Sequence, residues 1–263
     1  LHRVDRRQRQ MCIRDRYVVP YTAFLKLSQL GQDVLPPYRE SMVEVAMSPD
    51  MESAYQYLER TLVEELRRAL RAGDKSLMGV VLNALLAWPE CCFRPETVRH
   101  PHTKSVLLSL PALYGNQEMT PKEGALLERV RREAAHGRRT LVYTTYTGTR
   151  DTSARLKALL DQAGLRSAVL RSSVCAEKRE DWVMEQVDRG IDALVCNPEL
   201  VKTGLDMLEF PTILFMQTGY NVYTLQQAAR RSWRIGQTRD VDVDFLGYQG
   251  SAQMRCLQLM AQK

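Results

Sequence analysis

Short apolar runs alternate with helical patterns throughout the second half of the chain. Each run is only four to six residues long, and the stretches between the runs repeat their apolar residues at helical spacing. Strands that alternate with helices form parallel sheets, because each helix returns the chain to the start of the next strand. We therefore predict an α/β fold, a doubly wound parallel sheet, over residues 120–263. The expected strands are 141–145, 167–170, 193–196, 213–216 and 241–246, and the expected helices are 121–136, 151–163, 176–189, 224–233 and 251–261.

Residues 17–119 have a different pattern, which predicts a mainly helical segment. Ser48-Pro49-Asp50 combines an N-cap serine, a proline suited to the first turn and an acid near the positive helix end. A helix is expected from there to Gly73, which can end it. A second helix, from 78 to 88, should end at Pro89. Residues 42–47 alternate weakly and could form a strand.

The first 16 residues carry most of the net charge of the chain. They contain six Arg and two Asp, a net of +4 within the +6 of the whole sequence of 263 residues. Residues 11–16 (MCIRDR) also look like the translation of a sequencing adapter, so we expect residues 1–16 to be a non-native leader. The natural protein would then continue upstream of Tyr17. The alternative is a genuine basic arm that binds nucleic acid.

The six cysteines are scattered and form no C-x-x-C pair, which is typical of reduced thiols in a cytoplasmic protein. Cys91 and Cys92 with His100 and His102 could be considered a zinc site. Adjacent cysteines are poor co-ligands, however, and no second cysteine pair follows. We therefore predict no metal site in this chain. No apolar run approaches the roughly 20 residues that span a membrane.

A basic string near the end of the chain, residues 227–237, reads QAARRSWRIGQ. On a helix, Arg231 and Arg234 would project from one face, because residues three apart are neighbours there. Guanidinium groups are always charged, so two of them suit the γ-phosphate of a nucleotide and would stabilise charge as the phosphoryl bond breaks. The alternative is a solvated basic helix face.

This string resembles motif VI of the Swi/Snf-like branch of superfamily II helicases, Q-A-x-G-R-x-x-R-I-G-Q. Other stretches are similar to further motifs of the family, in the family's order, so that the resemblance covers about residues 33–248. They are 35–37 (LPP, the start of the second lobe), 141–145 (LVYTT, motif IV), 171–173 (RSS) with Arg179 downstream, 200–207 (LVKTGLDM, motif V) and 220–221 (YN). Five positions depart from the family pattern, which indicates a divergent bacterial or phage-type member. The family has glycine in place of Arg230 and Lys202, histidine in place of Trp233, aspartate in place of Gln217 and proline in place of Val222.

The resemblance implies a second RecA-like lobe that works with ATP, Mg²⁺ and DNA. Arg231 and Arg234 would be arginine fingers for ATP, which an N-terminal lobe would mainly hold together with its Mg²⁺. Gly204, Asp206 and Gln227 would face the nucleotide. The DNA, expected to be double-stranded, would be contacted through its phosphates. The residues expected to contact it are Thr145, Arg171, Ser172, Ser173, Lys202 and Thr203.

The polar loops have simpler explanations as well. Ser172 and Ser173 precede a helix, and their hydroxyls and amides suit either a phosphate or simple N-capping. The motif V stretch could be a tight turn in which Asp206 caps a helix. Trp233 could stack at the cleft between lobes or pack in the fold.

The sequence contains no G-x-x-x-x-G-K-[ST] and no acidic D-E-x-H box. Without a P-loop, nothing in the chain cradles the β- and γ-phosphates, so we expect no ATP hydrolysis by this chain alone. Two other functions remain open. One is a standalone or degenerate RecA-like module that binds nucleic acid or a protein partner. The other is an unrelated doubly wound enzyme that imitates motif VI by chance.

Overall fold

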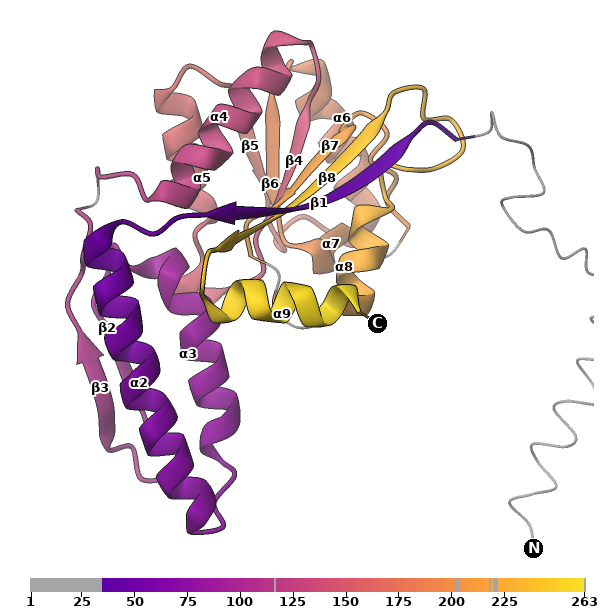
Figure 1. Ribbon diagram of the computed structural model, residues 1–263. Coiled ribbons are helices and arrows are strands. Elements are labelled where there is room, and N and C mark those ends of the chain that lie inside the picture. Colours follow the sequence, from indigo (N-terminus) through magenta and orange to yellow (C-terminus); the bar gives the residue numbers. More distant parts are fainter. Residues whose placement is uncertain (1–34, 116, 202–203, 218, 220–221, 263) are drawn as a thin grey trace, which may run out of the picture. The chain divides into compact units, whose positions relative to one another are not determined.

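A six-stranded parallel sheet forms the centre of the fold (Figure 1). The structure, a computed structural model, describes residues 35–115, 117–201, 204–217, 219 and 222–262. The strand order is β1-β8-β7-β4-β6-β5, and every pair is parallel. All five predicted strands are present, so the predicted doubly wound α/β sheet is confirmed. The strands are β1 (Tyr38–Val45), β4 (Thr140–Tyr143), β5 (Ser167–Leu170), β6 (Ala193–Cys196), β7 (Thr212–Phe215) and β8 (Val241–Tyr248).

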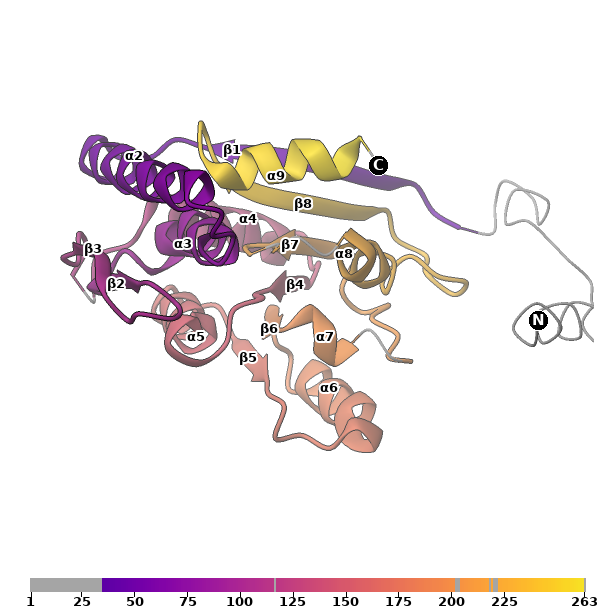
Figure 2. The ribbon, with the colours of Figure 1, turned by 90° about the horizontal axis from the view of Figure 1, so that it is seen from below.

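Helices cover both faces of this sheet, as Figure 2 shows. Because successive side chains of a strand point to opposite faces, Leu141 and Tyr143 pack on one side and Val142 packs on the other. The first side carries α6 (Arg179–Asp188), α7 (Pro198–Val201) and α8 (Val222–Ala229). The second side carries α4 (Pro121–Ala135) and α5 (Ser153–Gln162). The central strands are fully buried, which explains why they read as continuous apolar runs.

Strand β1 comes from the segment that the sequence predicts to be mainly helical. It pairs with β8 along its whole length, from Tyr38 opposite Val241 to Val45 opposite Tyr248. Most of its side chains are exposed, because it is an edge strand, so its apolar alternation is weak. The division into a segment 17–119 and a lobe 120–263 stays a prediction. The sheet takes strands from both sides of it, because β1 lies before residue 120 and the other five strands lie after it.

The helical part has its own core. It contains α2 (Pro49–Arg71), α3 (Leu77–Cys91) and a hairpin of β2 (Glu96–Arg99) and β3 (Val106–Leu110), and it packs on α9 (Ala252–Ala261). Ser48 caps α2 as predicted, by accepting a hydrogen bond from Met51 N at 3.3 Å. The prediction that the second helix ends at Pro89 was wrong. That helix continues through Pro89 to Cys91, since this last turn is buried in the core.

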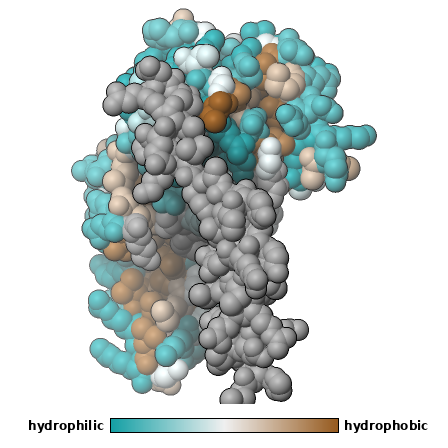
Figure 3. Space-filling model, turned by 90° about the vertical axis from the view of Figure 1, so that its right-hand side faces the viewer, coloured by the Kyte–Doolittle hydropathy of each residue, from teal (hydrophilic) through white to brown (hydrophobic). Residues whose placement is uncertain are grey.

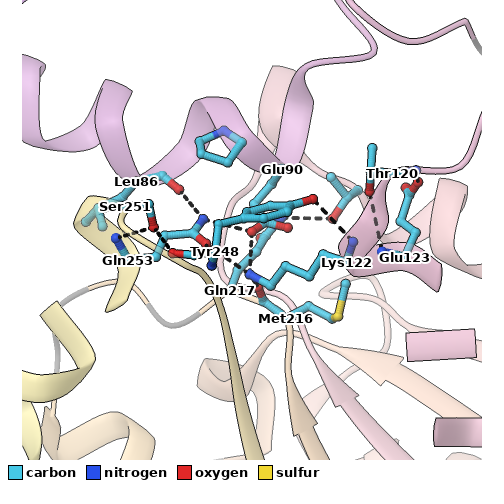
Figure 4. Close-up of polar contacts among 12 residues, drawn as sticks. Leu86, Glu90, Thr120, Lys122, Glu123, Met216, Gln217, Tyr248, Ser251 and Gln253 are labelled. Carbon is cyan, nitrogen blue, oxygen red and sulfur yellow. Dashed lines mark hydrogen bonds and ion pairs between the residues drawn. The ribbon is translucent and has the colours of Figure 1, made fainter. Parts of the chain in front are cut away.

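A buried ion pair joins the helical part to the sheet (Figure 4). Lys122 Nζ, which is almost fully buried, donates to Glu90 Oε1 of α3 at 2.5 Å and to the Met216 carbonyl after β7 at 2.7 Å. It also donates to Gln253 Oε1 of α9 at 3.2 Å, and Gln253 Nε2 donates to Glu90 Oε1 at 2.8 Å. Burial lowers the pKa of Lys122, although Glu90 opposes this shift. One amine therefore connects three elements at the strand ends.

The described residues contain no helix that is both long enough and apolar enough to cross a membrane. In the same residues, no group of three or more His, Cys, Asp or Glu is arranged to hold a metal ion. Cys91 and Cys92 are buried at the end of α3, whereas His100 Nε2 lies 3.4 Å from Asp74 Oδ2.

Candidate nucleotide and nucleic-acid site

Polar loops gather at the carboxyl ends of the parallel strands, where open α/β sheets bind ligands. A groove of about 370 Å³ opens between the loops that follow β4, β5 and β6. It brings Arg171 and Ser172, two of the predicted nucleic-acid contacts, next to the loop after β4. Its polar lining is Thr144, Thr147, Asp151, Ser153, Arg171, Ser172, Asn197 and Glu199.

Gln217 fixes the loop after β4. Its side chain is buried at the end of β7, and its Oε1 accepts hydrogen bonds from Thr145 N at 3.0 Å and Tyr146 N at 2.9 Å. Its Nε2 donates to Thr152 Oγ1 at 2.9 Å. The predicted DNA contact Thr145 is therefore held firmly, and its hydroxyl donates to the Gln217 carbonyl at 2.7 Å. The sequence singled out Gln217 only as a departure from the family aspartate, not as a residue that positions a loop.

Ser172 and Ser173 lie in an exposed turn and do not cap the following helix. That segment begins with a short 3₁₀ helix, Ala176–Lys178, whose preceding residue is Cys175. Arg179 holds this turn in place, since its Nε donates to the Val174 carbonyl at 3.2 Å and its Nη1 to the Leu200 carbonyl at 3.0 Å. The loops after β5 and β6 are therefore linked through one guanidinium.

The loop after α8 carries both predicted arginine fingers. The prediction that a helix extends to residue 233 and includes Arg231 was wrong, because α8 ends at Ala229 and Arg231 and Arg234 occupy the turns beyond it. The last turn tightens, and Arg231 N donates to the Ala228 carbonyl, three residues back, at 3.2 Å. Arg231 is half-buried near Tyr143. Burial raises the pKa of the Tyr143 hydroxyl, and the Arg231 charge opposes that shift.

The loop of residues 230–239 is bound to the loop of residues 204–210, which contains the rest of the motif V stretch. Met207 N donates to the Arg231 carbonyl at 3.0 Å. The buried amide of Gln237 donates to the carbonyls of Leu208 and Ser232, both at 2.9 Å. Two backbone segments that are far apart in sequence are therefore held as one unit.

Asp206 and Arg234 form an ion pair between these two loops, and each side chain is 46% exposed. The structure therefore brings together a residue predicted to face the nucleotide and a predicted finger. Gly204 lies nearby in the chain, exposed and with φ of 81°, a conformation that side chains disfavour. Gln227 is half-buried on α8. The predicted DNA contacts Lys202 and Thr203 lie outside the described residues.

Trp233 fastens the same loop to the start of β1. Its Nε1 donates to the Pro36 carbonyl at 2.8 Å, and its ring lies 4.8 Å from the Tyr38 ring, centroid to centroid. Of the two roles considered for this tryptophan, the structure favours packing within the fold.

Comparison with known proteins bears on the domain and the fold. Residues 122–236 match the helicase conserved C-terminal domain. No curated protein sequence matches the chain. Its fold is similar to the crystal structure of the C-terminal part of the Fun30 ATPase domain, with a TM-score of 0.66, 14% identity, and coverage of 86% of this chain and 90% of that one.

It is also similar to the Sulfolobus solfataricus SWI2/SNF2 ATPase core in complex with dsDNA. The TM-score is 0.62 at 18% identity, over 87% of this chain and 44% of that one. This chain therefore spans less than half of that ATPase core. Residues 122–236 thus match the helicase conserved C-terminal domain, and the chain has a fold similar to that of the C-terminal part of the Fun30 ATPase domain.

Proposed function

We propose that this chain is the C-terminal lobe of an ATP-driven DNA translocase or helicase of the Swi/Snf-like type. The observation that carries the proposal is the joined pair of loops, 204–210 and 230–239, which presents Arg234 at an exposed edge. Arg231 and Arg234 would stabilise the charge that develops as the γ-phosphoryl group of ATP is transferred. A loop that is fixed by its own backbone bonds needs little reorganisation to do so.

The residues present fit one half of a nucleotide site. They supply two guanidiniums, the exposed backbone of Gly204 with its positive φ, and the half-buried Gln227. They supply no P-loop, and the sequence has no acidic box to hold Mg²⁺. ATP and Mg²⁺ would therefore be held mainly by an N-terminal RecA-like lobe, against which this edge would close.

DNA would run across the groove at the carboxyl ends of β4, β5 and β6. Arg171, Ser172 and Ser173 are exposed there, and Thr145 stands beside the groove. Hydroxyls, amides and one guanidinium suit phosphate oxygens and do not read bases, so the contact would be independent of sequence. Lys202 and Thr203 are expected to contact DNA phosphates as well, and this expectation rests on the sequence alone.

Arginine removal in a two-lobe protein that carries this chain tests the proposal. Arg231→Ala and Arg234→Ala should each lower DNA-stimulated ATP turnover by about 10³-fold or more, which is the contribution of an arginine finger. Duplex DNA affinity should change less than about threefold, because neither residue lines the groove. Arg189→Ala, at the exposed residue that follows α6, is the matched control. Turnover within tenfold of the parent protein for both variants would refute the assignment.

The second candidate function is a RecA-like module that binds a partner without ATP hydrolysis. The Asp206–Arg234 ion pair favours it, because the carboxylate already neutralises one finger. In that case Asp206→Asn should leave the affinity for the partner unchanged. In an ATPase, the same change would alter the KM for ATP.

A further inference from the structure

Positive charge is concentrated at one end of the helical part. Two segments, residues 68–75 and 99–105, together contain five Lys or Arg and one Asp, a formal charge of +4. We call them the basic tip. Residues 1–16 account for a further +4 of the chain's +6, so the remainder of the chain is net negative. The five cations of the tip are all exposed: Arg68, Arg71, Lys75, Arg99 and Lys104.

The two segments meet in space. The end of α2 and the turn of the β2–β3 hairpin both lie at the lower end of the helical part in Figure 1. His100 of the hairpin contacts Asp74 of the turn after α2, with Nε2 and Oδ2 3.4 Å apart. The single acid of the tip is therefore engaged, because Asp74 Oδ1 also accepts from Ser76 N at 2.7 Å. The pairing of Arg68 with Glu65 is on the surface and neutralises little.

The hairpin turn is held in a defined shape by internal bonds. Lys104 has φ of 62° and is the only non-glycine residue with positive φ in the described part of the chain. Its N donates to the His100 carbonyl at 3.0 Å, and its carbonyl accepts from Arg99 Nη1 at 3.2 Å. Glycine or asparagine would adopt this conformation more easily. The exposed lysine there instead carries an ammonium group, whose Nζ donates to the Pro101 carbonyl of the same turn at 2.7 Å.

We propose that the basic tip binds the phosphate backbone of duplex DNA, at a site separate from the groove at the strand ends. A two-stranded β-ribbon fits the major groove of B-DNA, and the cations of the hairpin and of the adjacent end of α2 can neutralise phosphates. The tip would give the lobe a second hold on the duplex. The choice of DNA over an acidic protein rests on the proposed function.

Exposed apolar side chains lie in and next to the basic tip, and they suggest an acidic protein segment as the alternative partner. Leu70, Met78 and Val106 are 42%, 51% and 51% exposed, and Figure 3 shows hydrophobic side chains on the surface of the helical part. An acidic amphipathic protein segment would use both these side chains and the cations. DNA would use the cations alone, so the two partners respond differently to substitution.

The test measures binding of the whole chain to a fluorescent 20-base-pair duplex by anisotropy at several salt concentrations. The tip variant combines Arg71→Gln, Lys75→Gln and Lys104→Asn, since asparagine tolerates positive φ. The control variant removes the same charge from α4 and from the residue that follows α6, two elements that lie far from the tip in Figure 1, through Arg131→Gln, Arg132→Gln and Arg189→Gln. Both should keep the circular dichroism and melting temperature of the parent.

The tip variant should bind about tenfold more weakly in low salt. Its slope of log K against log salt should fall by about 2 to 3, since each lost phosphate contact contributes about 0.9. The control should change affinity less than about threefold. Equal losses in both variants, or no loss in the tip variant, would overturn the proposal.

Two further outcomes are decisive. Absence of duplex binding by the parent chain would also overturn the proposal. A second result would overturn it too: poly-glutamate displaces the DNA at a carboxylate concentration below that of the DNA phosphates, and Met78→Ser abolishes poly-glutamate binding. That pair of observations would assign an acidic protein partner. None of these measurements involves ATP turnover, so failure here leaves the proposed role of Arg231 and Arg234 untouched.

Discussion

Trp233 Nε1 donates a hydrogen bond to the Pro36 carbonyl at 2.8 Å, across 197 positions of sequence. This bond, with the tilted ring contact between Trp233 and Tyr38, connects the loop that carries Arg231 and Arg234 to the start of the edge strand β1. The tryptophan stands where the Swi/Snf-like motif has a histidine. The position of the arginines thus depends on where the chain enters the sheet.

Trp233→Phe should keep the ring contact and lose the hydrogen bond, at a cost of about 1 kcal/mol in the free energy of unfolding. Trp233→Ala should cost about 3 kcal/mol, because the packing against Tyr38 is lost as well. Amide hydrogen exchange should rise mainly in residues 36–40 and 230–239. Uniformly faster exchange across the whole fold would instead mean that Trp233 is a general packing residue.

Gln217 should tolerate replacement by glutamate better than by alanine. A carboxylate can still accept from Thr145 N and Tyr146 N, and the Thr152 hydroxyl can turn to donate to it. Gln217→Glu should therefore cost less than about 1 kcal/mol at pH 7, whereas Gln217→Ala leaves two amides without their acceptor and should cost about 2 to 3 kcal/mol. Urea unfolding of both variants measures the difference. Equal costs would contradict the loop-holding role of Gln217.

The buried Lys122–Glu90 pair should be costly to break on one side only. Lys122→Met leaves the Glu90 carboxylate buried without its cation and should destabilise the protein by about 3 to 5 kcal/mol. Adding Glu90→Gln should recover much of that loss, because an amide carries no charge and can still bond to Gln253. A double-mutant cycle by urea unfolding reports the coupling. Additive costs would show that the two side chains are energetically independent.

The stability of the fold should fall in alkali. Burial raises the pKa of the Cys91 thiol to about 11, and burial likewise raises those of Cys92 and Tyr55 to about 12. In the unfolded chain these groups lose their protons at lower pH, so the folded state binds more protons in this window. Stability is therefore present below about pH 9 and is lost as the pH rises towards 12.

Removal of the two thiols tests this prediction. Cys91→Ala with Cys92→Ala should give a shallower fall of the free energy of unfolding between pH 9 and 11, by roughly 3 kcal/mol. The lowered pKa of Lys122 makes the free energy of unfolding rise with pH instead, but this contribution is the same in the parent protein and in the double variant. Identical pH slopes in the parent and the double variant would contradict the prediction.

The sheet was predictable because its central strands are buried on both faces and are separated by well-marked helices. The edge strand β1 (38–45) was indicated only as a possible strand at 42–47, since its exposed side chains give only weak alternation. The end of α8 was missed for a different reason. The apolar and basic residues of 227–233 continue a helical period, but tertiary contacts of Trp233 and Gln237 turn the chain away after Ala229.

The roles of the site residues stay predictions, but the sheet topology alone implies part of their placement. Thr144, Arg171, Ser172 and Leu200 line one groove after β4, β5 and β6, whereas Arg231 and Arg234 lie on the loop that leads into β8. What the sequence could not provide was the role of the residues that position them. Gln217, Gln237 and Arg179 act through carbonyl and amide groups of distant loops, and such backbone partners leave no pattern in a sequence.

Steady-state ATP turnover of Arg234→Lys, in a two-lobe protein that carries this chain, tests the central claim most directly. Lysine keeps the positive charge and its attraction to Asp206 but loses the planar fork that a guanidinium offers to a phosphoryl group. A true arginine finger predicts a loss of about 100-fold or more in kcat, with duplex DNA affinity unchanged. A kcat within about threefold of the parent protein would contradict it and would leave Arg234 as a surface charge paired with Asp206.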